Sequence, residues 1–85
     1  MVSFKYVITD QAGIHARPAG LLVKAAKAAG AKITLECEGK SADATKLMAI
    51  MSMGVKGGKE VIVSVEGENE AEAAKAMEEF FKENL

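Results

Sequence analysis

The segment Lys-Ile-Thr-Leu-Glu-Cys-Glu, residues 32–38, alternates apolar and polar side chains without interruption. Ile33, Leu35 and Cys37 share one face of an extended chain, because successive side chains of a strand point to opposite sides. A strand with one apolar and one polar face belongs to a sheet buried on one side only, which is typical of antiparallel pairing. The segment therefore predicts an antiparallel sheet with one face covered and the other in water.

Segments on either side of residues 32–38 supply the other strands and the helices. Strand-like alternation recurs at residues 2–9, 41–43 and 60–66. Apolar residues at helical spacing predict helices over residues 16–29, 47–53 and 69–82. Asn69, followed three positions later by Glu72, predicts a capping box at the start of the last helix. The order β-α-β-β-α-β-α predicts a two-layer α+β sandwich with its helices on one face of the sheet.

Size and charge limit the classes of protein to which the chain can belong. Its 85 residues are enough for one core, so residues 1–85 are expected to form a single domain. The formal net charge of -1 argues against binding nucleic acid, which needs a basic face that contacts many phosphates. The net charge does not exclude a small local basic patch formed by Arg17, Lys24 and Lys27.

The sequence lacks the patterns of a membrane or secreted protein. No stretch approaches the roughly 18 apolar residues of a transmembrane helix, and the N-terminus has no signal-peptide pattern. The single cysteine, Cys37, cannot form an internal disulfide, and its alternating segment predicts a buried thiol rather than a reactive one. We expect a cytoplasmic protein that does not bind membranes.

Residues 13–18, Gly-Ile-His-Ala-Arg-Pro, contain the only histidine and the only proline of the chain. Proline belongs in the first turn of a helix, so His15 is expected at or just before a helix N-terminus, where free N–H groups attract anions. Arg17 adds a planar guanidinium suited to phosphate oxygens. Ala16, Arg17 and Pro18 therefore predict a phosphate-binding helix start, with His15 as a nucleophile that carries phosphate. The plainer alternative is a surface or capping histidine beside a solvated arginine.

Three methionines lie among the seven residues of the predicted helix at 47–53. A short helix cannot bury every face against one sheet, and methionine suits surfaces that meet several differently shaped partners. We expect part of this helix to be a docking surface. The alternative is that all of these side chains belong to the core.

Two segments resemble the two signatures of one family. Residues 13–18 are similar to the active-site signature of the HPr family, the histidine-containing phosphocarrier proteins of the bacterial phosphoenolpyruvate-dependent sugar phosphotransferase system. Residues 46–54 are similar to the second signature, and the resemblance spans essentially the whole chain. It implies an HPr-like open-faced β-sandwich, in which a four-stranded antiparallel sheet carries three helices on one face.

The resemblance also implies a phosphocarrier rather than an enzyme. His15 would accept a phosphoryl group on Nδ1 from phospho-enzyme I, with help from Arg17, and pass it to EIIA domains of sugar permeases. No cofactor is implied. One histidine and one cysteine far apart in the chain predict no metal site.

A docking face shared by these partners is implied on the first two helices. Its residues are Gly20, Lys24, Lys27, Leu47, Met48 and Met51. Regulatory proteins are further candidate partners, and a monomer is expected.

Lys46 departs from the family pattern. In Gram-positive members, a serine at the start of the second helix is phosphorylated by a dedicated kinase. Lysine cannot accept that phosphate, and its positive charge is poorly suited to a helix N-terminus. We predict that this regulatory switch is absent or altered, with Thr45 as a weak alternative acceptor and Ser41 and Ser52 as weaker ones.

Two other functions remain open on the same fold. The first is a regulatory module that modulates other proteins without carrying phosphate. The resemblance implies that such relatives lack the active histidine, so His15 argues against this function. The second is a carrier of a nitrogen-related phosphotransferase branch, which would differ mainly in its partners.

Overall fold

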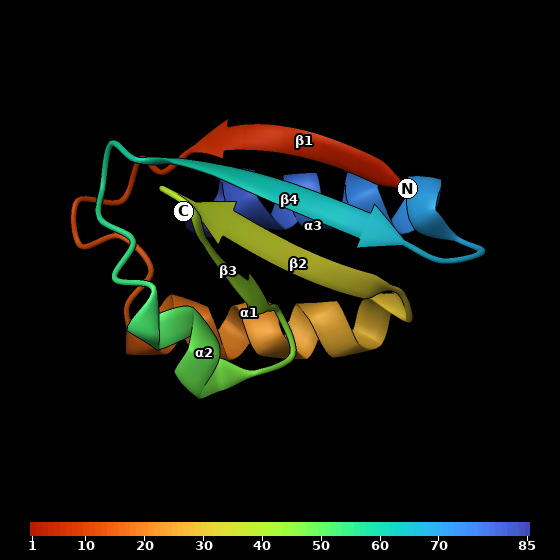
Figure 1. Cartoon of the computed structure of the whole chain (residues 1–85), viewed down its shortest axis with the longest axis horizontal. Coiled ribbons are helices and arrows are strands. Elements are labelled where there is room, and N and C mark those ends of the chain that lie inside the picture. Colours follow the sequence, from red (N-terminus) through yellow and green to blue (C-terminus); the bar gives the residue numbers. More distant parts are fainter.

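The computed structural model describes all 85 residues, and its seven elements follow the predicted order (Figure 1). Their bounds are β1 Val2–Val7, α1 Ala16–Ala29, β2 Lys32–Cys37, β3 Lys40–Asp43, α2 Leu47–Ser52, β4 Glu60–Glu66 and α3 Glu70–Asn84. The predicted fold class is confirmed, since a four-stranded antiparallel sheet carries three helices on one face. β1 ends at Val7 rather than at Thr9, because Thr9 bonds to Leu85 after α3 instead of continuing the ladder.

The strands lie in the order β1-β4-β2-β3, so the last strand in sequence lies between the first two (Figure 1). Val63 of β4 pairs with Phe4 of β1 on one side and with Leu35 of β2 on the other. β2 and β3 pair antiparallel as a hairpin. The sheet therefore pairs the first strand with the last, and it brings the loop after β1 close to the segment that precedes β4.

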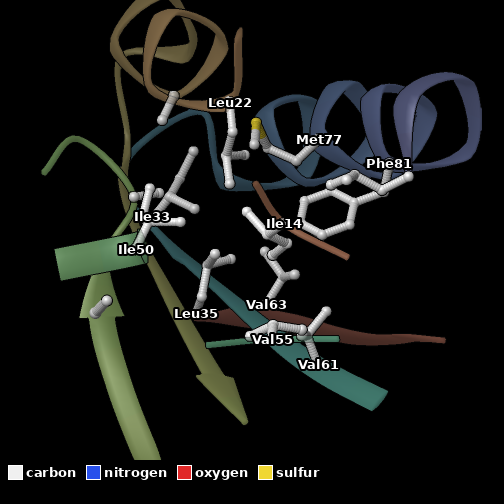
Figure 2. Close-up of a cluster of buried hydrophobic side chains, with 14 of the residues drawn as sticks. Ile14, Leu22, Ile33, Leu35, Ile50, Val55, Val61, Val63, Met77 and Phe81 are labelled. Atoms are coloured by element: carbon white, nitrogen blue, oxygen red, sulfur yellow. The ribbon is translucent and has the colours of Figure 1, made fainter. Parts of the chain in front are cut away.

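One cluster of 21 buried residues joins the sheet to the helices. Figure 2 shows side chains of the sheet meeting Leu22 of α1, Ile50 of α2 and Phe81 of α3. Cys37 belongs to this cluster, and burial raises the pKa of its thiol, so the prediction of a buried cysteine is confirmed. None of the three helices combines the length and the apolar character needed to cross a bilayer.

The capping box predicted at Asn69 is wrong. Asn69 does precede α3, but its side chain makes no capping hydrogen bond. Its amide nitrogen donates instead to the backbone oxygen of Ala29 at 2.8 Å, which satisfies a carbonyl at the end of α1. The backbone of Asn69 (φ −105°, ψ 29°) is also not extended, whereas the backbone of a capping residue typically is.

Candidate functional site

His15 is the N-cap residue of α1, as the sequence predicts. Its backbone is extended (φ −102°, ψ −175°), and its carbonyl oxygen accepts the N–H of Ala19 at 2.9 Å, the first bond of the helix. Its side chain makes no capping hydrogen bond and is 45% exposed. The backbone therefore fixes His15 at the helix end while the imidazole stays open to a partner.

The two residues before His15 lock the loop onto the core. Ile14 is buried, and its N–H donates to the backbone oxygen of Val55 at 3.0 Å. Gly13 has φ +70°, and a Cβ at this position would lie 2.0 Å from the same Val55 oxygen. Only glycine combines that backbone conformation with so close an approach. The loop that presents His15 is thereby held against the segment that follows α2.

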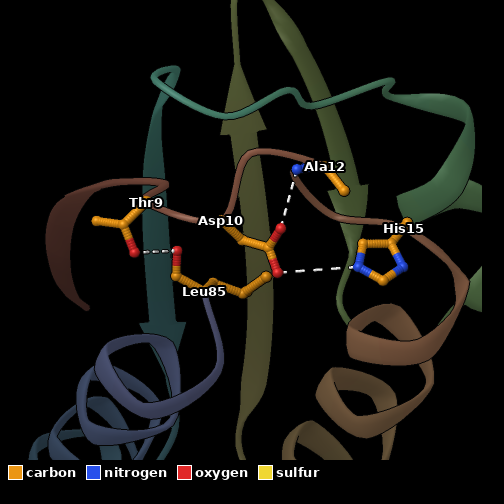
Figure 3. Close-up of polar contacts among 5 residues, drawn as sticks. All are labelled: Thr9, Asp10, Ala12, His15 and Leu85. Carbon is orange, nitrogen blue, oxygen red and sulfur yellow. Dashed lines mark hydrogen bonds and ion pairs between the residues drawn. The ribbon is translucent and has the colours of Figure 1, made fainter.

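The start of this loop is fixed by the end of α3. The backbone oxygen of Leu85 accepts hydrogen bonds from the Thr9 N–H, from the Thr9 hydroxyl at 2.8 Å and from the Asp10 N–H at 2.9 Å (Figure 3). The Asp10 carbonyl then accepts the N–H of Gly13 at 2.9 Å. Residues 9–14 are therefore held at both ends by backbone bonds to distant parts of the chain.

The Asp10 carboxylate faces the imidazole of His15 (Figure 3). Its Oδ1 accepts the N–H of Ala12 at 2.9 Å, and its Oδ2 lies 3.8 Å from Nε2 of His15. This separation is longer than a hydrogen bond and is that of a charge contact. Negative charge thus lies on the Nε2 edge of the ring, and Nδ1 has no hydrogen-bond partner.

The first turn of α1 offers two free N–H donors. Ala16 and Arg17 begin the helix, so no carbonyl of the helix accepts their N–H groups. Pro18 is the third residue of the helix and has no N–H, in agreement with its predicted place in the first turn. The N–H groups of Ala16 and Arg17, together with the positive end of the helix, form a local site for an anion beside His15.

Arg17 is exposed and has no acidic partner within ion-pair distance. Its side chain borders an open surface pocket of about 230 Å³ that also contains the imidazole. The pocket is lined by Asp10, His15, Arg17, Pro18, Leu21 and Asn84. An unpaired guanidinium in this pocket is available for an anion carried by His15.

The methionine-rich helix α2 is divided between core and surface. Ile50 is fully buried, and Met53, just after the helix, is also buried. Met48 is 76% exposed, Leu47 is 40% exposed and Met51 is 38% exposed. The prediction that this helix cannot bury every face is confirmed, and three apolar side chains remain in contact with water.

The predicted docking residues of α1 lie on one exposed stripe. Gly20, Lys24 and Lys27 continue from Arg17 at spacings of three and four residues. Figure 1 shows α2, which contacts α1, over the N-terminal half of that helix. Lys27 lies in the last turn, about 18 Å along the axis from His15 at 1.5 Å per residue. By the same measure Gly20 lies about 8 Å along the axis from His15, in the half of α1 over which α2 lies, whereas Lys27 lies at the far end.

Lys46 is the N-cap residue of α2, and its side chain makes no capping bond. Thr45 donates both its N–H (2.8 Å) and its hydroxyl (2.6 Å) to Asp43, and these bonds lower the pKa of the Asp43 carboxyl. The Ser52 hydroxyl donates to the Ala49 carbonyl at 2.9 Å. Two of the three alternative phosphate acceptors therefore have hydroxyls that are already hydrogen-bonded.

Four residues of the site were not predicted from sequence. One is Asn84, which lines the pocket from the last position of α3. Asp10 lies between the strand expected over residues 2–9 and the segment 13–18, although an Asp that bonds to an N–H two residues later is a common turn pattern. Leu21 is 43% exposed beside the pocket, and its helical spacing of four from Arg17 was a usable signal. Val55 acts through its backbone oxygen, for which the sequence carries no signal.

No group of three or more His, Cys, Asp or Glu side chains is placed so that it could hold a metal ion. The histidine and the buried Cys37 belong to separate parts of the structure, since Cys37 borders a second pocket with Glu38 and Met53. The polar groups gathered at His15 are one carboxylate, one guanidinium, the Asn84 carboxamide and two backbone N–H groups.

Known proteins match this chain in sequence and in structure. Residues 2–83 match the family model described as the PTS HPr component phosphorylation site. An HPr from Thermoanaerobacter tengcongensis is 37% identical, with a TM-score of 0.92 over 99% of this chain and 94% of that chain. The histidine-containing phosphocarrier protein of Mycoplasma is 30% identical, with a TM-score of 0.92 over 96% of this chain and 93% of that chain.

A third relative is Crh, the catabolite repression protein of Bacillus subtilis. It is 34% identical, with a TM-score of 0.77 over 100% of this chain and 98% of that chain. Its structure is a domain-swapped dimer. The matches therefore include phosphocarriers and a protein of catabolite repression.

Proposed function

Because the chain belongs to the HPr family of phosphocarrier proteins, we propose that it carries a phosphoryl group on His15 between two partners. The proposed donor is phospho-enzyme I, and the proposed acceptors are EIIA domains of sugar permeases. The protein is a carrier with no turnover of its own and needs no cofactor. The observation that carries the proposal is an exposed His15 side chain at a helix start that offers two free N–H groups.

The chemistry of acceptance uses the Nδ1 lone pair of His15. That lone pair attacks the phosphorus, a P–N bond forms, and the bond between phosphorus and the donor breaks. The oxygens of the phosphoryl group carry the negative charge both during transfer and after the group is bound to His15. The N–H groups of Ala16 and Arg17 donate to these oxygens, and the free guanidinium of Arg17 neutralises them. Donation to EIIA is the reverse, and the electron pair of the P–N bond returns to Nδ1.

Both partners dock on one face in this proposal, because each must reach the same imidazole. The exposed side chains of Leu47, Met48 and Met51 supply its apolar part. Lys24 and Arg17 supply positive charge, which favours an acidic surface on each partner. Nothing lies within 4 Å of the Cβ position at Gly20, so a partner can approach the backbone of α1 closely there. Lys27, at the far end of α1, contributes only to the rim of this docking face.

We further propose that residues 1–85 form one HPr domain that acts as a cytoplasmic monomer. A single buried cluster draws on all three helices and on the sheet, which supports one domain. A free docking face for two successive partners supports a monomer, and the net charge of -1 argues against nucleic acid as a partner. Light scattering after size exclusion should give the mass of one 8.9 kDa chain, and twice that mass would contradict the proposal.

The position of Lys46 supports the absence of serine-kinase regulation. Its side chain has no hydroxyl, and the Thr45 hydroxyl is committed to Asp43. Incubation with an HPr kinase and ATP should leave the protein unphosphorylated. Stoichiometric phosphate on any hydroxyl of residues 45–52 would refute this part of the proposal.

One experiment separates the carrier from a regulatory module that carries no phosphate. The protein is mixed with enzyme I and phosphoenolpyruvate, and an acid-labile phosphoryl group on His15 is expected. Comparison of sugar-branch and nitrogen-branch EIIA proteins as acceptors then distinguishes the two branches. Faster transfer to the nitrogen-branch acceptor would move the assignment to that branch.

A further inference from the structure

Three hydrogen bonds fix Asp10 beside the imidazole. Its N–H donates to Leu85 and its carbonyl accepts from Gly13, each at 2.9 Å, so its backbone is tied in both directions. Its Oδ1 accepts the N–H of Ala12 at 2.9 Å, which sets the orientation of the carboxylate. The remaining oxygen, Oδ2, lies 3.8 Å from Nε2 of His15 (Figure 3). The carboxylate is thus held in place independently of the ring that it faces.

A carboxylate beside one ring nitrogen selects the tautomer of a neutral imidazole. Neutral histidine has one nitrogen that bears a proton and one that bears a lone pair, and a carboxylate can only accept. Asp10 therefore favours the proton on Nε2 and leaves the lone pair on Nδ1. Figure 3 shows Nδ1 on the edge of the ring away from Asp10, and no hydrogen bond engages it.

Asp10 is the only acidic residue of the pocket that holds His15. The other charged side chain of that pocket is Arg17, a cation, which cannot accept a proton from the ring. Asn84 and the apolar residues of the lining carry no charge. Asp10 is therefore the only negatively charged side chain of the pocket that can select the tautomer.

We propose that Asp10 is a positioning residue that holds His15 as the Nε2–H tautomer and so presents Nδ1 as the atom that accepts phosphate. The role of Nδ1 as phosphate acceptor rests on the proposed carrier function, whereas the preference for the Nε2–H tautomer does not. The Nδ1 lone pair forms the bond to phosphorus, the proton stays on Nε2, and the ring becomes cationic. The Asp10 carboxylate then lies beside that positive charge. On donation the electron pair returns to Nδ1, and no proton has to move.

The tautomer can be measured without any partner protein. Nitrogen-15 NMR of the His15 ring, at alkaline pH where histidine is neutral, is compared for the native chain, Asp10→Asn and Glu36→Gln. Asparagine keeps an oxygen that accepts the Ala12 N–H, removes the charge and places an NH2 donor where Oδ2 faces Nε2, so both changes act against the Nε2–H tautomer. Glu36 is an exposed residue of β2, so Glu36→Gln is a control for charge removal. The native chain should be mainly Nε2–H, and Asp10→Asn should change the tautomer ratio about threefold, the size expected of an exposed charge contact.

An unchanged ratio in Asp10→Asn, or an equal change in Glu36→Gln, would overturn the proposal. Circular dichroism of each variant establishes that it is folded. A second measurement is the rate of phosphorylation by phospho-enzyme I, which should fall about threefold in Asp10→Asn and stay constant in Glu36→Gln. If enzyme I phosphorylates none of the three proteins, the carrier function fails while the tautomer result stands. If it phosphorylates all three at one rate, the role proposed for Asp10 in transfer fails while the carrier function stands.

Discussion

The N–H of Ile14 donates to the backbone oxygen of Val55 at 3.0 Å, and this bond joins the loop of His15 to the segment that follows α2. Ile14 is also buried in the core, so the residue next to the histidine is fixed by its backbone and by its side chain. The proposed phosphoryl site and the proposed docking helix are therefore parts of one rigid arrangement. A partner that docks on α2 meets an imidazole whose position is already set.

Gly13→Ala should destabilise the protein by about 3 kcal/mol or more, since the new Cβ meets the Val55 oxygen and φ is positive. Gly20→Ala is the matched control, because its Cβ has open space within a helix. It should raise the free energy of unfolding by up to about 1 kcal/mol. Urea unfolding measures both. Equal stability of the two variants would contradict the account of the loop.

Met48→Ala should leave the fold unchanged within about 0.5 kcal/mol, because its side chain is mostly exposed. It should raise the KM for phosphorylation by enzyme I about fivefold, the loss of one contact at the centre of an interface. Ile50→Ala, in the same helix but fully buried, should instead cost about 2 to 5 kcal/mol of stability. Val7→Ala removes an exposed apolar side chain of β1 and should not change the KM. The same KM for Met48→Ala and the native chain would remove α2 from the docking face.

Arg17→Ala should slow phosphoryl transfer about a hundredfold, because it removes a group that neutralises the transferring oxygens. Its stability should stay within about 0.5 kcal/mol of the native value, since Arg17 forms no ion pair. Lys75→Ala, which removes an exposed cation from α3, should change neither quantity. Parallel losses of transfer and stability in Arg17→Ala would point to a structural role.

Lys46→Ser should make the chain a substrate of an HPr kinase and should also stabilise α2. Lys46 makes no capping bond, whereas a serine hydroxyl at this position can accept an N–H of the first turn. The gain in stability should be about 0.5 to 1 kcal/mol. Mass spectrometry after incubation with the kinase and ATP detects the phosphate. Phosphorylation of the native chain to the same extent would show that Lys46 is no barrier.

The face of each strand could be predicted from sequence, but the order of the strands could not. Alternation in residues 32–38 indicates which side chains are buried, because the two faces of one strand differ in polarity. A sheet with one buried and one exposed face is in turn typical of antiparallel pairing. The neighbours of β4 depend on distant segments, and no period in the sequence encodes them. The capping box at Asn69 failed for a related reason, since the carbonyl of Ala29 competes for its side chain.

The candidate site likewise has one part that could be predicted from sequence and one that could not. His15, Arg17 and Pro18 lie next to one another in sequence and share one helix start, so local rules were enough to predict their arrangement. The backbone of Asp10 is held by Leu85, far away in the sequence, so its place beside His15 could be recognised only in three dimensions.

Phosphorylation by enzyme I is the decisive measurement of whether His15 carries a phosphoryl group. The native chain and His15→Ala are each incubated with enzyme I and phosphoenolpyruvate and analysed by intact mass spectrometry before and after acid treatment. We expect one acid-labile phosphoryl group on the native chain and none on His15→Ala. Absence of phosphate on the native chain, or phosphate that persists in His15→Ala, would contradict this expectation.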